Sequence, residues 1–205
     1  MLAIIDYGVG NLFSLQCSLK KIGVEAVVTK DPQEIKNADR IILPGVGAFG
    51  DASKKLQESG LVELITEEAK SGKPFLGICL GMQLLFEKGY EYGEHNGLGF
   101  LEGNVIALEG KIDSSLQIPH MGWNALDFKA ESPLFKYINN GDFVYFVHSY
   151  YATDCEDSVI ATSEYSIPVT AAVGKGNIFG CQFHPEKSGD VGLNILRGFT
   201  EIGAN

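Results

Sequence analysis

Strand-like and helix-like segments alternate along residues 1–87, and this alternation restricts the possible folds more than any other feature of the sequence. Apolar runs typical of strands buried on both faces lie at residues 1–6, 25–29, 40–45 and 73–78. Between them, apolar residues recur every three or four positions, as on one face of a helix. This order predicts a parallel sheet with helices packed on both of its faces.

The predicted helices carry recognisable start and stop signals. Apolar residues of segment 12–22 lie on one face of the first helix, which Gly23 is positioned to end. The sequence DPQE (31–34) opens a short second helix, because Asp31 can cap it and a proline fits its first turn. Further helices are predicted over residues 51–71, with a break near Gly60, from residue 80 to residue 87, and over about 189–201.

The second half of the chain has a different pattern, with short strand-like runs separated by short turns. These runs cover residues 103–108, 121–128, 143–147, 158–163, 169–174 and 177–183. The sequence GKGN (174–177) between the last two runs is a hairpin signal. The expected fold is α/β: an open, mostly parallel sheet flanked by helices, with an added antiparallel or mixed β portion. A chain of this length is expected to form one domain over residues 1–205.

Charge and composition exclude several classes of function. The formal net charge is −10, which is a poor match for the phosphate backbone of nucleic acids. No apolar run approaches the roughly 20 residues of a membrane span, and residues 1–10 do not form a signal peptide. We therefore expect a cytoplasmic protein whose 4 cysteines stay reduced. Their spacing contains no CxxC pair, and nothing in the sequence suggests a metal or an organic cofactor.

One cysteine stands between two glycines at a predicted strand-to-helix junction. In PFLGICLGMQLLF (74–86), Cys79 follows a predicted strand and lies between Gly77 and Gly81. The glycines allow a sharp turn like that of a nucleophile elbow, at the end of the strand where open α/β sheets carry reactive groups. A helix N-terminus beside the sulfur favours the thiolate, and the N–H of Leu80 can hold an oxyanion. The bracket alone leaves open a buried cysteine that packs as a small apolar residue.

The other cysteines show no such bracket and are interpreted as small buried residues. They are Cys17, Cys155 and Cys181.

A cysteine nucleophile needs a base, and the base needs an acid to orient it. His184 follows a predicted strand in GCQFHPEKS (180–188), and Glu186 comes two residues later. In an extended segment these side chains point the same way, so Glu186 can hold one ring nitrogen while the other faces the sulfur. The alternative is a loop end with a solvated glutamate. The remaining histidines are interpreted as packed or interface residues (His120 and His148) and as an exposed loop residue (His95).

These two motifs belong to a larger set that resembles a known family. The set comprises DYGVGNL (6–12), LPGVGAFG (43–50), GICLGMQLLFE (77–87), GLGFLEGNV (97–105), PHMGWN (119–124), YFVHSYY (145–151) and GCQFHPEKS (180–188). It is similar to the class I, triad-type glutamine amidotransferases, and more narrowly to the branch that supplies ammonia to a cyclase in histidine biosynthesis. The motifs span almost the whole chain in the family's order, and PHMGWN and PGVG separate this branch from its relatives.

The resemblance implies a role for each residue of the site. Cys79 attacks the side-chain amide of glutamine, His184 activates the thiol and protonates the departing ammonia, and Glu186 orients His184. The implied oxyanion hole consists of backbone groups of Val46, Gly47 and Leu80, and the strand at Val46 flips before its N–H points inward. The implied glutamine contacts are Gln83, Ser149 and Tyr150.

The resemblance also implies a heterodimer with a (β/α)8-barrel cyclase. Ammonia passes through that barrel and gives imidazole glycerol phosphate and an aminoimidazole carboxamide ribonucleotide. The implied interface residues are Asn11, Met121, Trp123, Tyr145 and Lys187. For Trp123 the alternative is a core aromatic residue, and for Lys187 it is a solvated charge.

Other readings stay open from the sequence alone. A paralogue with the same chemistry delivers its ammonia to a different acceptor, such as a sugar in surface polysaccharide synthesis. A cysteine peptidase or a γ-glutamyl hydrolase uses a related scaffold, and a flavodoxin-like binding module would keep the fold without turnover. The intact set of Cys79, His184 and Glu186 favours an enzyme over the last of these.

Overall fold

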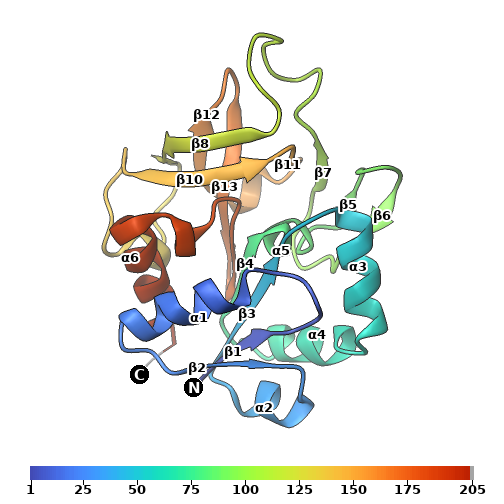
Figure 1. Cartoon of the computed structure of the whole chain (residues 1–205), viewed down its shortest axis with the longest axis vertical. Helices are drawn as coiled ribbons and strands as arrows, with labels where there is room; N and C mark the ends of the chain where they lie inside the picture. Colours follow the sequence, from blue (N-terminus) through green and yellow to red (C-terminus); the bar gives the residue numbers. More distant parts are fainter. Residues whose placement is uncertain (204–205) are drawn as a thin grey trace.

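A mixed eight-stranded sheet runs through the computed structural model, which describes residues 1–203 (Figure 1). In spatial order its strands are β2 (Ala26–Thr29), β1 (Leu2–Ile5), β3 (Arg40–Gly45), β4 (Phe75–Cys79), β14 (Ile178–Cys181), β13 (Pro168–Lys175), β12 (Val159–Glu164) and β9 (Asp127–Phe128). The first five of these strands run parallel, and the last three pair antiparallel. The α/β fold with an added antiparallel portion is therefore confirmed.

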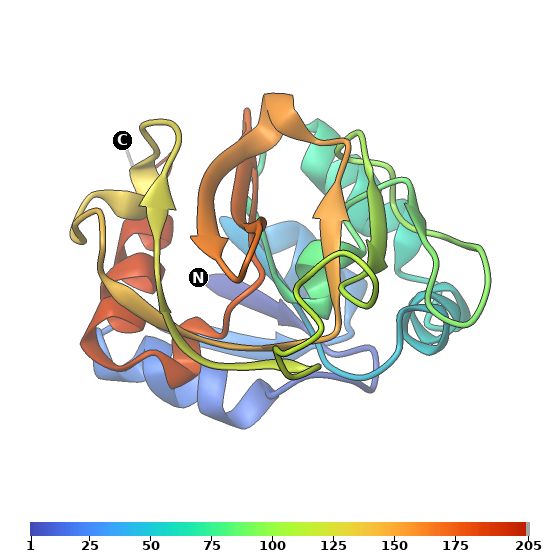
Figure 2. The ribbon, with the colours of Figure 1, turned by 90° about the horizontal axis from the view of Figure 1, so that it is seen from above.

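Helices cover both faces of the parallel strands. One face carries α1 (Leu12–Lys21) and α6 (Gly189–Thr200), which lie side by side in Figures 1 and 2. The other face carries α2 (Pro32–Asn37), α3 (Phe49–Glu58), α4 (Val62–Lys70) and α5 (Leu80–Gln83). Strand alternation divides the core accordingly: Ile4 of β1 belongs to the cluster under α1 and α6, and Ile5 belongs to the cluster under α3 and α4.

Two small sheets complete the chain. One pairs β8 (His120–Ala125) with β10 (Phe143–His148), and the other has the order β11 (Tyr150–Thr153), β7 (Asn104–Ala107), β5 (Lys88–Gly89), β6 (His95–Asn96). Short 3-10 turns lie at η1 (Pro133–Phe135), η2 (Glu156–Ser158) and η3 (Pro185–Lys187). In Figure 1 both small sheets lie above the parallel strands, on the side where α5 follows β4.

Several predicted boundaries were wrong, and each has a physical reason. The helix predicted over residues 80–87 ends at Gln83, because the carbonyls of Leu84, Leu85 and Phe86 accept hydrogen bonds from the backbone of segment 98–101. The strand predicted over residues 121–128 is divided, since β8 pairs with β10 and β9 pairs with β12. The analysis of the sequence missed β11 and the two-residue strands β5 and β6.

Two side chains also differ from expectation. Cys17 is exposed, because it lies two positions from the buried Leu15 and thus on roughly the opposite side of α1. His95 is half-buried in β6, where its ring fills the space over Gly50. Cys155 and Cys181 are buried as predicted.

Within the described part of the chain, the helices are all too short or too polar to span a bilayer. That residues 1–205 form a single domain stays a prediction.

Candidate active site

Cys79 occupies a strained turn at the carboxyl end of β4. Its φ is 54° and its ψ is −113°, a left-handed conformation that a residue with a side chain rarely adopts. The two neighbouring glycines explain how the turn fits. A Cβ at Gly81 would overlap the carbonyl oxygen of Leu43, and one at Gly77 would lie 2.6 Å from the carbonyl oxygen of Gly81. The strand and the single-turn helix α5 can therefore pack closely only with glycine at both positions.

His184 and Glu186 form a buried pair beside this turn. His184 Nδ1 lies 2.8 Å from Glu186 Oε1, and both side chains are only 3% exposed. The expected extended segment is a 3-10 turn instead, yet it brings the two side chains together as predicted. The backbone N–H of His184 donates to Tyr145 O at 3.0 Å, and Ser188 Oγ donates to His184 O at 2.6 Å. Because Ser188 Oγ also accepts from the N–H of Tyr145 at 3.0 Å, His184 is held to β10 both directly and through Ser188.

The protonation of His184 depends on its two neighbours. Burial lowers the pKa of His184, but hydrogen bonds to Cys79 and Glu186, with their negative charges, outweigh burial and raise the pKa to about 9. The imidazolium is therefore the favoured form at neutral pH. A cationic ring between a sulfur and a carboxylate is the arrangement of an activated cysteine nucleophile.

These groups face a cavity of about 300 Å³ at the carboxyl edge of the sheet. The predicted residues that line it are Cys79, His184, Val46, Gly47, Leu80, Gln83, Ser149 and Tyr150. Glu186 stands behind His184 and lines a smaller adjoining hollow. The structure therefore brings together all the residues predicted for the catalytic, oxyanion and glutamine-contact roles.

The loop after β3 and the N-terminus of α5 supply the backbone groups near Cys79. Val46 is 41% exposed and Gly47 has a φ of 99°, so this loop bends at the cavity mouth.

Gln83 points its amide inward: Nε2 donates to Tyr150 O at 3.1 Å and to Gln182 Oε1 at 3.0 Å.

The sequence analysis missed several groups of this site. Glu91 lines the cavity from the loop before β6, and its Oε2 accepts from the N–H of Phe49 at 2.7 Å. Nothing in its local sequence pointed to that position. Gln182 is fully buried, and its Nε2 donates to Cys79 Sγ at 3.9 Å. Its spacing of two residues from His184, on the same side of an extended segment, was the available signal.

His120 and His148, interpreted as packed or interface residues, are indeed packed. His148 lines the cavity, and its Nδ1 lies 2.8 Å from Tyr150 O. His120 Nδ1 is 3.0 Å from His148 Nε2, and its ring stacks on Tyr165 and Phe146. Burial lowers the pKa of both histidines, that of His148 to about 3.

The predicted partner surface is an exposed aromatic patch on β8 and β10. Met121 is 60% and Trp123 is 52% exposed, so Trp123 is not a core residue. Tyr145 is paired opposite Trp123, with ring centroids 6.0 Å apart, and Lys187 Nζ lies 6.0 Å from the Tyr145 centroid. Asn11 is placed differently, because its Nδ2 donates to Glu186 Oε1 at 3.4 Å.

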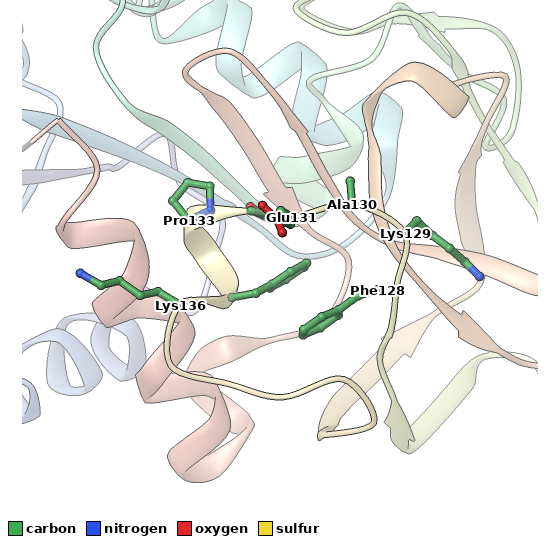
Figure 3. Close-up of a pocket in the computed structure, with 8 residues that line it drawn as sticks. Phe128, Lys129, Ala130, Glu131, Pro133 and Lys136 are labelled. Atoms are coloured by element: carbon green, nitrogen blue, oxygen red, sulfur yellow. The ribbon is translucent and has the colours of Figure 1, made fainter.

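A larger hollow of about 770 Å³ lies elsewhere, along the segment from β9 to η1 (Figure 3). The stacked rings of Phe128 and Phe135 form much of its wall. It contains no residue predicted for the site. Among residues 1–203 no group of three or more His, Cys, Asp or Glu side chains is arranged to hold a metal ion.

Comparison with known proteins adds three findings. Residues 3–201 match the family model described as glutamine amidotransferase class-I. The chain is 52% identical over 203 residues to the imidazole glycerol phosphate synthase subunit HisH of Caldanaerobacter subterraneus subsp. tengcongensis, and 51% identical over 201 residues to the subunit HisH of Lactococcus lactis subsp. lactis. In both cases the match covers 98% of each chain.

Among solved structures, one described as a glutamine amidotransferase superposes with a TM-score of 0.77 at 19% identity, covering 99% of each chain. The PurLQS structure from Thermotoga maritima gives a TM-score of 0.76 at 21% identity, covering 98% of this chain and 97% of that one. At these identities the two likenesses establish the fold.

Proposed function

Because this chain belongs to the class-I glutamine amidotransferase family, we propose that it is the glutaminase subunit of imidazole glycerol phosphate synthase. Identity of about one half over almost the full length of relatives with that name supports the assignment. The observation that carries the chemistry is that Cys79 and His184 face one cavity, with Glu186 bonded to His184 from behind. Because the chain belongs to this family, we prefer this assignment to the alternatives of a peptidase and of a non-enzymatic binding module.

The proposed hydrolysis of glutamine has two steps. The Cys79 thiolate attacks the side-chain carbonyl carbon, and the carbonyl electrons move to an oxyanion held by backbone N–H groups at Leu80 and at Val46 or Gly47. When the oxyanion collapses, the C–N bond breaks and His184 gives its proton to the departing ammonia. Neutral His184 then takes a proton from water, which attacks the thioester and releases glutamate and the thiolate. Glu186 keeps His184 aligned throughout.

The cavity wall supplies contacts for the rest of the glutamine molecule. Gln83, Ser149 and Tyr150 lie where they can bind its polar groups. Glu91 is a carboxylate on the same wall and suits the positive α-ammonium group. A reduced thiol is essential for this chemistry, and we propose the cytoplasm as its compartment.

The names of the relatives describe subunits, which supports a partner subunit for this chain. We propose that the partner is a (β/α)8-barrel cyclase and that it docks on Met121, Trp123, Tyr145 and Lys187. Trp and Tyr side chains are enriched among the residues that carry most of the binding energy of an interface. Asn11, whose Nδ2 donates to Glu186 Oε1, is the residue that we propose passes the state of the partner to the triad.

The decisive experiment measures ammonia release from glutamine by the chain alone and then with the cyclase and its nucleotide ligand. We expect slow turnover alone and a steep rise in the complex. If the cyclase and its ligand change nothing, the histidine-pathway assignment fails. A paralogue that feeds a different acceptor, such as a sugar, then becomes the better proposal.

A further inference from the structure

The buried side-chain amide of Gln182 contacts the sulfur of Cys79. Gln182 directly follows β14, the neighbour of β4, and it is fully buried. Its Nε2 donates to Cys79 Sγ at 3.9 Å, and its Oε1 accepts from Gln83 Nε2 at 3.0 Å. Burying a side-chain amide is costly unless its polar atoms are hydrogen-bonded, so both bonds matter to the position. The reaction described above gives Gln182 no part.

The direction of these bonds is fixed by a backbone carbonyl. Side-chain amides can be assigned in either orientation, so the nitrogen facing Cys79 needs independent support. Tyr150 O can only accept, which places Gln83 Nε2 toward it at 3.1 Å. The same nitrogen faces Gln182, so the atom of Gln182 that meets it must be the oxygen. The NH₂ group of Gln182 is then the one directed at the sulfur.

The acceptor that sets this direction is itself held firmly. Tyr150 O also lies 2.8 Å from Nδ1 of the buried His148, so two side-chain donors converge on one carbonyl. The backbone N–H of Gln182 is fixed in turn by Ala171 O at 2.9 Å. Gln83 Nε2 therefore donates both to Tyr150 O and to Gln182 Oε1, and Gln182 Nε2 in turn donates to Cys79 Sγ.

We propose that Gln182 is a positioning residue for the nucleophile: its N–H donates to Cys79 Sγ, favours the thiolate over the thiol and fixes the direction of the sulfur. The inference rests on the proposed role of Cys79 in glutamine hydrolysis. A donor facing a charged acceptor forms a stronger bond than one facing a neutral acceptor, so the N–H stabilises the ionised sulfur selectively.

Other ionisable groups around Cys79 remain unchanged in the test. His184 contacts the sulfur, with Glu186 behind it, and His148, Glu91 and Lys187 line the same cavity. Tyr7 follows β1, and its hydroxyl donates to Pro44 O at 2.8 Å. Burial, followed by the charge of Cys79, raises the pKa of Tyr7. A shift seen only on substitution of Gln182 is therefore not caused by these groups.

The test is the pH dependence of Cys79 alkylation by iodoacetamide in the chain alone, with peptide mapping to identify the alkylated residue. A Cys17→Ser background removes the exposed thiol. Gln182→Met replaces the amide by an apolar side chain of similar length. Gln182→Glu keeps an acceptor for Gln83 and places a negative charge beside the sulfur.

We expect the alkylation midpoint of Gln182→Met to rise by about one pH unit, which slows the reaction about tenfold below the midpoint. Gln182→Glu is expected to raise it further. If the Gln182→Met variant does not fold, Gln182→Asn makes the same test. Its shorter side chain fits the existing space and moves the NH₂ group away from the sulfur.

Asn177 supplies a matched control at the opposite end of β14. Its Nδ2 donates to Ala69 O and Lys73 O, both at 2.8 Å, far along the strand from the sulfur. Asn177→Leu is expected to lower stability and leave the midpoint unchanged. An unchanged midpoint in the Gln182 variants would overturn the inference. Because alkylation needs neither glutamine nor a partner, a wild-type chain that fails to hydrolyse glutamine would overturn only the proposed function.

Discussion

Two walls of one cavity use the same residue type in opposite ways. On the wall formed by the main sheet, contact with Cys79 and Glu186 raises the pKa of His184 to about 9 despite its burial. On the wall formed by the small sheets, His148 is also buried but meets a backbone carbonyl and a second histidine, and its pKa falls to about 3. Burial is common to both, so the neighbouring charge decides which histidine is cationic.

This difference separates a chemical wall from a structural one. The main-sheet wall carries the charged His184–Glu186 pair and the strained backbone of Cys79 at the end of β4. Strained backbone of this kind is concentrated at active sites. The small-sheet wall shapes the cavity, and its strand β8 presents Met121 and Trp123 to the outside. Substitutions on the first wall should therefore remove turnover without affecting association. Substitutions on the outer side of the small-sheet wall should weaken association with the partner without affecting the fold.

The largest effect is expected from Cys79→Ala. Without the nucleophile, glutamine hydrolysis should fall by about 10⁴-fold or more, while binding of the partner stays intact. Ammonia release and titration of the partner measure the two properties. Cys17→Ser, on the exposed side of α1, is the control and should keep wild-type turnover. Turnover of Cys79→Ala near the wild-type rate would remove Cys79 as the nucleophile.

Glu186→Gln tests the same wall with a smaller change. A neutral amide keeps the size of the side chain but removes a charge that raises the pKa of His184, so this pKa should fall below about 9. We expect turnover to fall by about 10²- to 10³-fold, with a shifted pH profile. Glu201→Gln, which removes a surface ion pair with Lys136, should leave both unchanged. A profile identical to wild type would show that Glu186 does not orient the base.

The main-sheet wall was largely predictable from local sequence. Buried parallel strands appear as continuous apolar runs, so β1, β3 and β4 were located within a few residues. The glycine bracket marked Cys79 as a candidate nucleophile, and the spacing of two residues predicted that His184 and Glu186 lie together, as they do. Each of these signals lies within a few residues of the group that it places.

The small-sheet wall was not predictable in the same way. Strands β5 and β6 are two residues long and exist only through pairing with distant segments. Glu91 reaches the cavity through tertiary packing, with no marker in its own segment, and the motif around His148 was recognised only through resemblance to a family. Ser149 and Trp123, like Val46 of the loop after β3, were assigned roles only through resemblance to a family.

Trp123→Ala tests the outer side of the small-sheet wall. Loss of an exposed aromatic anchor should weaken partner binding by about 10- to 100-fold and reduce the activation of turnover accordingly. The thermal midpoint should change little, because the side chain is half-exposed. Phe146→Ala is the contrast: this residue of the paired strand is fully buried, and its loss should cost about 3–5 kcal/mol of stability. A large loss of stability in Trp123→Ala with normal coupling would contradict its role as a contact for the partner.

The two buried histidines also impose a pH dependence on the free energy of unfolding. His184 has a raised pKa, so its stabilising contribution is complete below about 6.5 and is lost as the pH rises toward about 9. His148 has a lowered pKa, so the unfolded chain binds a proton that the folded chain refuses, and stability is lost as the pH falls below about 6.5 toward 3. His120 adds to the acidic limb with the same sign.

These opposite signs predict a maximum of stability near pH 6.5, with a loss on the acidic side that approaches about 1.4 kcal/mol per pH unit for each such histidine. Urea unfolding between pH 5 and pH 8.5 measures the curve above the range in which carboxylates titrate. His148→Gln should flatten the acidic limb and leave the basic limb unchanged, because Gln keeps a donor for Tyr150 O and does not titrate. If the acidic limb stays as steep in that variant, His148 is not its source, and the contrast between the two walls loses its electrostatic basis.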